Sequence, residues 1–191
     1  MLGAVFSVAP DRAAPSSATS AKSREYELVL RAPGDSALEG LTHLTLAEIE
    51  PGESLRGPTP GSESSLGWAG FELAQLDGTT DDSPLAADRL QFVFSERPES
   101  VSPVEYDEYY QEHLRENLQM ESFSAGWRWR ITPIHLDSSR QPPGSHLALY
   151  RMEKGWSEAG QEVSTHSARL RETWPAWFTH MRLSAISATA L

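Results

Sequence analysis

The sequence contains no cysteine among its 191 residues. Disulfide bonds, thiol catalysis and thiolate metal ligands are therefore excluded, which fits a reducing compartment. The chain also lacks any apolar run near the roughly 20 residues that a membrane-spanning helix needs. The N-terminal run LGAVFSVAP is short and follows no Lys or Arg, so a signal peptide is not expected. These absences predict a cytoplasmic protein without a membrane partner.

Positive charge is also scarce in this chain. The 16 Lys and Arg residues stand against 27 Asp and Glu residues, which gives a formal net charge of −11. Nucleic acids and anionic membranes bind to basic patches, so neither is expected as the main partner. Hydrophobic residues make up 39% of the chain, which is enough for a substantial core. An enzyme or a binding protein for small molecules fits this composition.

Several motifs that bind nucleotides or metals are missing. The sequence has no G-x-G-x-x-G, no G-x-x-x-x-G-K-[ST] and no G-x-S-x-G nucleophile turn. Its six histidines show no metal-binding spacing such as H-E-x-x-H. We therefore predict that the protein uses neither a cofactor nor a metal ion.

What the sequence does contain is a helix signal with an unusual polar face, between Val101 and Leu118. Ser102 is a typical N-cap, Pro103 suits the first helical position, and Glu105 can complete a capping box. With about 3.6 residues per turn, one stripe of this helix carries Tyr106, Tyr109, Tyr110, His113, Leu114 and Asn117. Leu and Ile usually fill such a stripe, so its hydroxyls and imidazole indicate a candidate functional face.

Strand patterns lie on both sides of this helix. Apolar or alternating runs predict strands at 90–94, 124–132 and 146–152. A second helix is predicted from about Ser157 to Trp174, where Pro175 interrupts it. The final run MRLSAISATAL is expected to form the last strand. The order over residues 90–191 is therefore β-α-β-β-α-β, the ferredoxin-like arrangement.

The first 89 residues are predicted to be rich in strands. The runs LGAVFSV, EYELVLRAP, LTHLTLAEIE and WAGFELAQLD look like strands, and none of the segments between them matches the amphipathic helix. LGAVFSV is also similar to LQFVFSE, which hints at two copies of one unit. We therefore divide the chain at DGTTDDSPLAAD into a degenerate half-repeat with a flexible N-terminal segment, 1–89, and a second domain, 90–191.

The spacing Tyr106-x-x-Tyr109-Tyr110-x-x-His113 resembles the EthD-like family of the dimeric α+β barrel superfamily. In that family the first aromatic is usually Phe and the aromatic pair is usually Trp-Tyr. Residues 127–130, WRWR, match its arginine-rich strand, and residues 147–150, LALY, match its third strand. The resemblance covers about the last hundred residues. It implies an α+β fold in which ferredoxin-like units form a barrel, either as a pseudo-dimer within one chain or as a homodimer.

His113 is the central catalytic candidate. An imidazole with the ordinary pKa of about 6.5 suits proton exchange near neutral pH. Tyr110 and Tyr109 are predicted to hold a substrate oxygen, since a phenol can polarise a carbonyl. The two tyrosines point about 100° apart on a helix, so we expect only one of them to share a cavity with His113. The alternatives are a core imidazole at the helix end and aromatic packing between helix and sheet.

The candidates for substrate binding lie on the polar stripe and on two strands. Trp127 and Trp129 alternate with Arg128 and Arg130, so one face of that strand presents two indoles, which either line a flat cavity or fill a core. The guanidinium groups are expected to pair with surface acids or with a substrate carboxylate. The full set of substrate-binding candidates is Tyr106, Asn117, Trp127, Trp129, His146 and Tyr150.

The resemblance implies a cofactor-independent enzyme with a cavity between sheet and helices. We hypothesise a cyclase or dehydratase-type lyase of secondary metabolism that acts on an aromatic polyketide or a similar flat hydrophobic substrate. His113 would remove a proton next to a carbonyl, while Tyr110 or Tyr109 holds the enolate. The alternatives are a pericyclase, a non-catalytic accessory protein that binds a small molecule, and a cofactor-free quinone-forming monooxygenase. Haem, found elsewhere in the superfamily, would need His113, His146 or His166 as axial ligand, and no sequence feature favours it.

Overall fold

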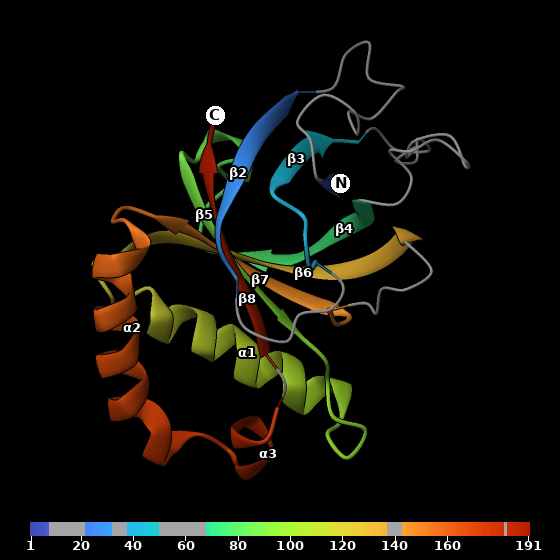
Figure 1. Cartoon of the computed structure of the whole chain (residues 1–191). Coiled ribbons are helices and arrows are strands. Elements are labelled where there is room, and N and C mark those ends of the chain that lie inside the picture. Colours follow the sequence, from blue (N-terminus) through green and yellow to red (C-terminus); the bar gives the residue numbers. More distant parts are fainter. Residues whose placement is uncertain (8–21, 32–37, 50–67, 137–142, 182) are drawn as a thin grey trace.

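The computed structural model describes residues 1–7, 22–31, 38–49, 68–136, 143–181 and 183–191. Eight antiparallel strands form a closed barrel in the order β1-β3-β2-β8-β5-β7-β6-β4 (Figure 1). They are β1 (Leu2–Ser7), β2 (Ser23–Arg31), β3 (His43–Glu48), β4 (Trp68–Gly78), β5 (Arg89–Ser95), β6 (Phe123–Leu136), β7 (His146–Met152) and β8 (Leu183–Ala190). Closure gives each strand two neighbours, so no edge of the sheet is left open.

The helices lie outside the barrel, on one side of it (Figure 1). They are α1 (Pro103–Asn117), α2 (Trp156–Leu170) and α3 (Ala176–Thr179), and short 3₁₀ turns occur at η2 (Pro84–Ala86) and η3 (Arg171–Thr173). All three α-helices belong to the part of the chain that also contains β5 to β8. In the described residues up to Gly78, the elements are strands alone. Among the described residues, the helical layer therefore covers one side of the ring.

Local signals in the sequence account for these elements. The Ser102 side chain accepts a hydrogen bond from the backbone N–H of Glu105 at 3.1 Å, and Pro103 occupies the first helical position. The predicted start of α1 is thereby confirmed. The second predicted helix is found as α2, followed by η3 and, after Pro175, by α3. Proline at that point breaks the helix because it removes a backbone donor.

The expected architecture, an α+β barrel built from ferredoxin-like units, is wrong. The strands close a single eight-stranded antiparallel β-barrel, and one chain completes the ring. The two junctions between early and late strands are the pairs β2–β8 and β4–β6. These pairings satisfy the edges that an open four-stranded sheet would leave exposed. Strands from both predicted domains, 1–89 and 90–191, thus belong to one ring, and the division itself remains a prediction.

The barrel interior is filled with side chains. Phe6, Phe71, Phe92 and Phe94 pack against one another with ring centroids 5.8–6.4 Å apart. Trp127 and Trp129 belong to the same buried cluster. Successive side chains of a strand point to opposite faces, so Arg128 between the two indoles points outward.

Two features of β6 hold α1 against the outer face of the barrel. A Cβ atom on Gly126 would lie 2.9 Å from the Leu114 side chain, so glycine allows α1 to approach this closely. Arg128, which is only 4% exposed, binds the carboxylate of Asp107 on α1 at 2.8 Å and that of Asp77 at 3.0 Å. It also donates a hydrogen bond to the backbone oxygen of Asp107 at 3.1 Å. One guanidinium therefore joins α1 to the barrel.

Replacing Arg128 by Met should destabilise the fold. The change removes hydrogen bonds to two partly exposed carboxylates and one backbone oxygen, and we expect a loss of about 2 kcal/mol in the free energy of unfolding. Arg130→Met on the same strand is the matched control, since that side chain is exposed. Urea denaturation measures the free energy of unfolding of both variants. Equal stability of the two would contradict this role for Arg128.

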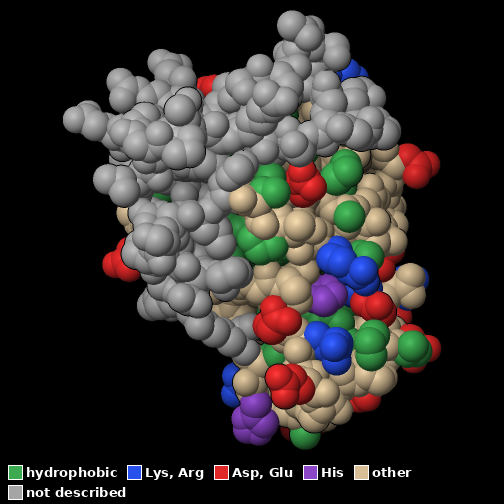
Figure 2. Space-filling model, turned by 90° about the vertical axis from the view of Figure 1, so that its right-hand side faces the viewer, with side chains coloured by type: hydrophobic (Ala, Val, Ile, Leu, Met, Phe, Trp, Pro, Cys, Tyr) green, Lys and Arg blue, Asp and Glu red, His purple; other side chains and the backbone are tan. Residues whose placement is uncertain are grey.

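Charges of both signs mix on the face shown in Figure 2, where described Lys and Arg side chains lie beside Asp and Glu side chains and hydrophobic groups. The ion pairs Arg24–Asp88, Arg151–Asp82 and Lys154–Glu121 are examples of such neighbours. In the described part of the chain, no helix combines the length and the apolar character needed to cross a membrane.

Candidate functional site

The layer between the helices and the outer face of β5 to β8 contains seven of the nine predicted site residues. The Tyr106 ring is fully buried, and its hydroxyl lies 2.8 Å from the Ser95 hydroxyl. The same ring contacts the His146 imidazole at a centroid distance of 4.8 Å. Tyr110 follows one turn later along α1, with its ring centroid 4.7 Å from that of Tyr106. The start of α1 therefore seats two tyrosines directly on β5 and β7.

Tyr110 lies next to the guanidinium that joins α1 to the barrel. The Arg128 Cζ atom lies 5.6 Å from the centre of the Tyr110 ring, within the range of a cation–π contact. Burial raises the pKa of Tyr110 well above its ordinary value. The phenol that is predicted to act in catalysis thus also has a structural contact with Arg128.

His113 lies in a cage of aromatic rings, with its side chain 13% exposed. The Tyr109 ring stacks on the imidazole with centroids 5.5 Å apart and planes inclined by 12°. Phe178 on α3 and Trp174 approach edge-on at 5.0 Å and 6.2 Å. The Nδ1 atom lies 3.4 Å from a carboxylate oxygen of Glu116, one turn further along α1. An Nδ1–H that donates to Glu116 leaves the Nε2 lone pair as the acceptor.

The electrostatics of this cage keep His113 neutral near pH 7. Burial, together with the nearby His166, lowers the pKa of His113 to about 4. Burial also raises the pKa of the Glu116 carboxyl, helped by the neighbouring Glu112. Burial raises the pKa of the Tyr109 phenol, and the Glu116 charge adds to this effect. The cage thus presents a neutral imidazole, a carboxylate and a protonated phenol.

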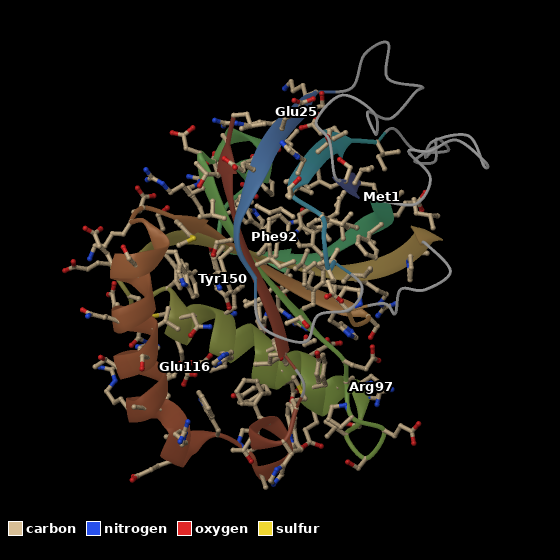
Figure 3. All side chains as sticks on the ribbon, in the orientation of Figure 1. Met1, Glu25, Phe92, Arg97, Glu116 and Tyr150 are labelled. Carbon is tan, nitrogen blue, oxygen red and sulfur yellow. The ribbon has the colours of Figure 1, made fainter. Side chains whose placement is uncertain are left out.

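Polar groups without a hydrogen-bond partner gather in the same layer. Asn117 on α1 donates to the Tyr150 hydroxyl at 2.9 Å, and Figure 3 shows Tyr150 between the barrel and α1. Gln91 pairs in register with Tyr150 on one side and with Ser187 on the other, so the three side chains share the outer face. Among the described residues, the Gln91 Oε1, Ser187 Oγ and Tyr109 hydroxyl atoms are buried and unpartnered. Buried polar atoms usually have a partner in native proteins, often an ordered water, so these three groups retain unused hydrogen-bonding capacity.

Trp127 and Trp129 do not join these residues. Both indoles fill the barrel interior, on the opposite face of β6 from α1. The alternation of the WRWR run predicted two indoles on one face, and that face is the core. His113 and the two tryptophans are therefore separated by the sheet.

The sequence interpretation missed several residues around His113. Glu116 follows it by three positions on one helix, a spacing that brings two side chains together, so this partner was accessible from the sequence. The second predicted helix ends at Trp174, but neither Trp174 nor Phe178 was expected beside His113. Gln91 stands as a single polar residue within the apolar run LQFVF, which is the one local signal for its position.

Metal ligation has no support from the described side chains. Within those ranges, no group of three or more His, Asp or Glu residues has an arrangement that would hold a metal ion. His135 lies on β6, but its side chain is outside the described residues. His180 is exposed just after α3.

Comparisons with known proteins give no relative. No family model matches the chain, and no curated protein or solved structure is significantly similar to it. The resemblance to the EthD-like family is therefore not upheld, because it predicted an architecture that the closed antiparallel barrel contradicts. The specific activities that it implied, polyketide cyclisation and related lyase chemistry among them, lose their basis.

Proposed function

We propose that the protein is an enzyme that moves a proton on a flat, oxygenated, hydrophobic molecule bound between the helices and the barrel. The observation that carries this proposal is the pairing of His113 with Glu116 beside the unpartnered hydroxyl of Tyr109. An imidazole that is oriented by a carboxylate can act as a base. A phenol beside it can donate a hydrogen bond to the enolate that forms when a proton is removed from the carbon adjacent to a carbonyl. The surrounding aromatic rings suit an aromatic substrate.

In the proposed reaction, Nε2 of His113 takes the proton from the carbon next to the carbonyl. The electron pair of the broken C–H bond forms the enolate, and Tyr109 donates a hydrogen bond to its oxygen. Glu116 stabilises the imidazolium that forms, because its carboxylate lies at Nδ1. The imidazolium then returns the proton to the substrate. The lowered pKa keeps the buried His113 unprotonated at neutral pH, the form in which Nε2 can accept a proton.

Exchange of C–H protons for deuterium tests this proposal. The probe is 2-tetralone, a flat ketone with acidic C–H bonds, whose exchange in D₂O above the background rate is followed by NMR. His113→Ala and His113→Gln should lower the catalysed rate by about 10²–10⁴-fold, the usual contribution of a positioned base. Tyr109→Phe should lower it by about tenfold or more, since the variant lacks only the hydroxyl.

Glu108→Gln, an exposed change on the same helix, is the matched control and should leave the rate unchanged. Near-UV circular dichroism checks that the His113 variants keep their aromatic packing. An exchange rate that survives both His113 substitutions would refute the proposal.

A second candidate function is binding without catalysis. The observation that favours it is the tight aromatic enclosure of His113 by Tyr109, Trp174 and Phe178. In that case 2-tetralone would broaden the resonances of residues in this layer without any catalysed exchange. The same titration therefore separates the two functions.

A further inference from the structure

A second site candidate lies at one end of the barrel, away from the helices. The starts of β1 and β5 and the ends of β3 and β4 meet at this end. A cavity of about 560 Å³ opens here, lined by Met1, Leu2, Glu48, Ala74, Gln75, Thr80, Asp81, Asp82, Ser83, Pro84 and Trp129. Figure 3 shows Met1 on the side of the barrel opposite to Glu116 and the helices. The volume of this cavity is typical of pockets for small organic ligands.

The wall formed by residues 79–84 is fixed by hydrogen bonds. The backbone N–H of Thr79 donates to the Gly126 oxygen at 2.9 Å, and the Gly126 N–H donates to the Thr79 hydroxyl at 3.0 Å. The Ser83 hydroxyl caps η2 and donates to the Glu48 carboxylate at 3.4 Å. The Asp82 N–H donates to the Thr80 hydroxyl at 3.1 Å. The segment that bears the acids is therefore tied to both β3 and β6.

The inner wall combines apolar surface with an unused hydrogen-bond donor. Trp129 is 3% exposed and reaches the cavity from the barrel core together with Leu2, while Ala74 adds apolar surface from the exposed side of β4. Among the described residues, its indole N–H has no hydrogen-bond partner. A buried indole N–H usually finds an acceptor, so a bound molecule that carries one would satisfy it.

The rim of the cavity is negatively charged. It carries the carboxylates of Glu48, Asp81 and Asp82, while the amino group of Met1 is the single positive group among the lining residues. Arg151, which is not among the lining residues, binds Asp82 at 3.4 Å. Glu48 has only the Ser83 hydroxyl as a described partner, and Asp81 has no described ion pair. The remaining negative charge favours a cationic ligand.

We infer that this cavity binds a protonated organic amine with an apolar, flat body and a hydrogen-bond acceptor. The ammonium group lies at the rim, beside Asp81 and Glu48, where charge-assisted hydrogen bonds are available. The apolar body covers Leu2, Ala74 and the Trp129 ring. The acceptor meets the Trp129 indole N–H. This binding is independent of the proton transfer proposed at His113, which lies on the other side of the sheet.

A matched series of three indoles tests the inference by isothermal titration calorimetry. The probes are 5-methoxytryptamine, the neutral alcohol 5-methoxytryptophol and the anion 5-methoxyindole-3-acetate. We expect the amine to bind about tenfold more tightly than the alcohol and the anion to bind more weakly than both. Raising the ionic strength should reduce the difference in affinity between the amine and the alcohol, because salt screens the charge interaction. Equal affinities for the three probes, or no binding of the amine, would overturn the inference.

Three variants locate the binding. Asp81→Asn combined with Glu48→Gln should remove the preference for the amine, since both carboxylates become neutral. Trp129→Phe should lower the affinity for 5-methoxytryptamine by about fivefold. The affinity for tryptamine, which lacks the methoxy acceptor, should stay nearly unchanged. Glu108→Gln on α1 removes an exposed carboxylate remote from the cavity, and it should change the affinity for neither 5-methoxytryptamine nor tryptamine. A preference for the amine that persists in the double variant would place its binding elsewhere and refute the site.

Discussion

Trp127→Ala should lower the free energy of unfolding by about 3–5 kcal/mol, the range measured for removal of a large buried aromatic side chain. The indole is 1% exposed and, among the described residues, is the largest side chain that is almost completely buried. It packs so closely on β4 that a Cβ atom on Gly78 would lie 2.8 Å from its Cδ1. The Arg151 guanidinium covers the ring from 5.7 Å. Neighbouring strands cannot collapse into the void because their backbones are paired around a closed ring.

Urea denaturation followed by far-UV circular dichroism measures this loss. Trp127→Phe keeps an aromatic ring and should lose less than half as much, which provides a measurable variant if Trp127→Ala fails to fold. Val104→Ala shortens an exposed side chain and should change stability little. A loss below about 1 kcal/mol for Trp127→Ala would show that the barrel interior is not the dominant core.

Acid should destabilise the protein through His113. Burial lowers its pKa from 6.5 to about 4 in the folded state, whereas the unfolded chain takes up the proton near pH 6.5. The unfolded state therefore binds more protons between these values, and stability falls as the pH falls. One imidazole with this shift contributes a loss of about 3 kcal/mol between pH 6.5 and pH 4. Above pH 7 its contribution is constant.

Replacing the imidazole by a ring that does not titrate isolates this contribution. His113→Phe should flatten the fall of the unfolding free energy between pH 6.5 and pH 4. Burial also lowers the pKa of His146 and His166, so part of the slope persists in the variant. His180→Phe changes an exposed residue and should retain the wild-type slope. Parallel pH profiles for His113→Phe and the wild-type protein would contradict the buried neutral imidazole.

Local patterns in the sequence predict the elements of this protein well and its architecture poorly. Ser102 and Pro103 fix where α1 begins, and the alternation of residues 127–130 places two indoles on one face of a strand. Neither signal says which strands become neighbours. The pair Gly78 and Trp127 joins β4 to β6 across nearly fifty residues, and the pair Leu28 and Ala188 joins β2 to β8 across most of the chain. Such pairings depend on register and packing over the whole sheet, which a local period does not encode.

The candidate site divides in the same way. Helical spacing alone groups Tyr106, Tyr109, Tyr110, His113 and Asn117, and it would also have supplied Glu116. Gln91 and Ser187 lie side by side in the candidate site because of the register between β5 and β8, which the local sequence does not specify. Trp129 was assigned to the His113 site because a strand pattern does not reveal which of its faces is the inside of a barrel.

β8 lies between β2 and β5 in the ring although it follows every other strand along this sequence. During synthesis, the edges of β2 and β5 therefore stay unpaired until β8 has left the ribosome. The residues of α2, η3 and α3 are translated between β7 and β8, which extends this interval by a few seconds at about 5–20 residues per second. Open strand edges are templates for pairing with other chains, so the nascent protein is most vulnerable to aggregation in that interval.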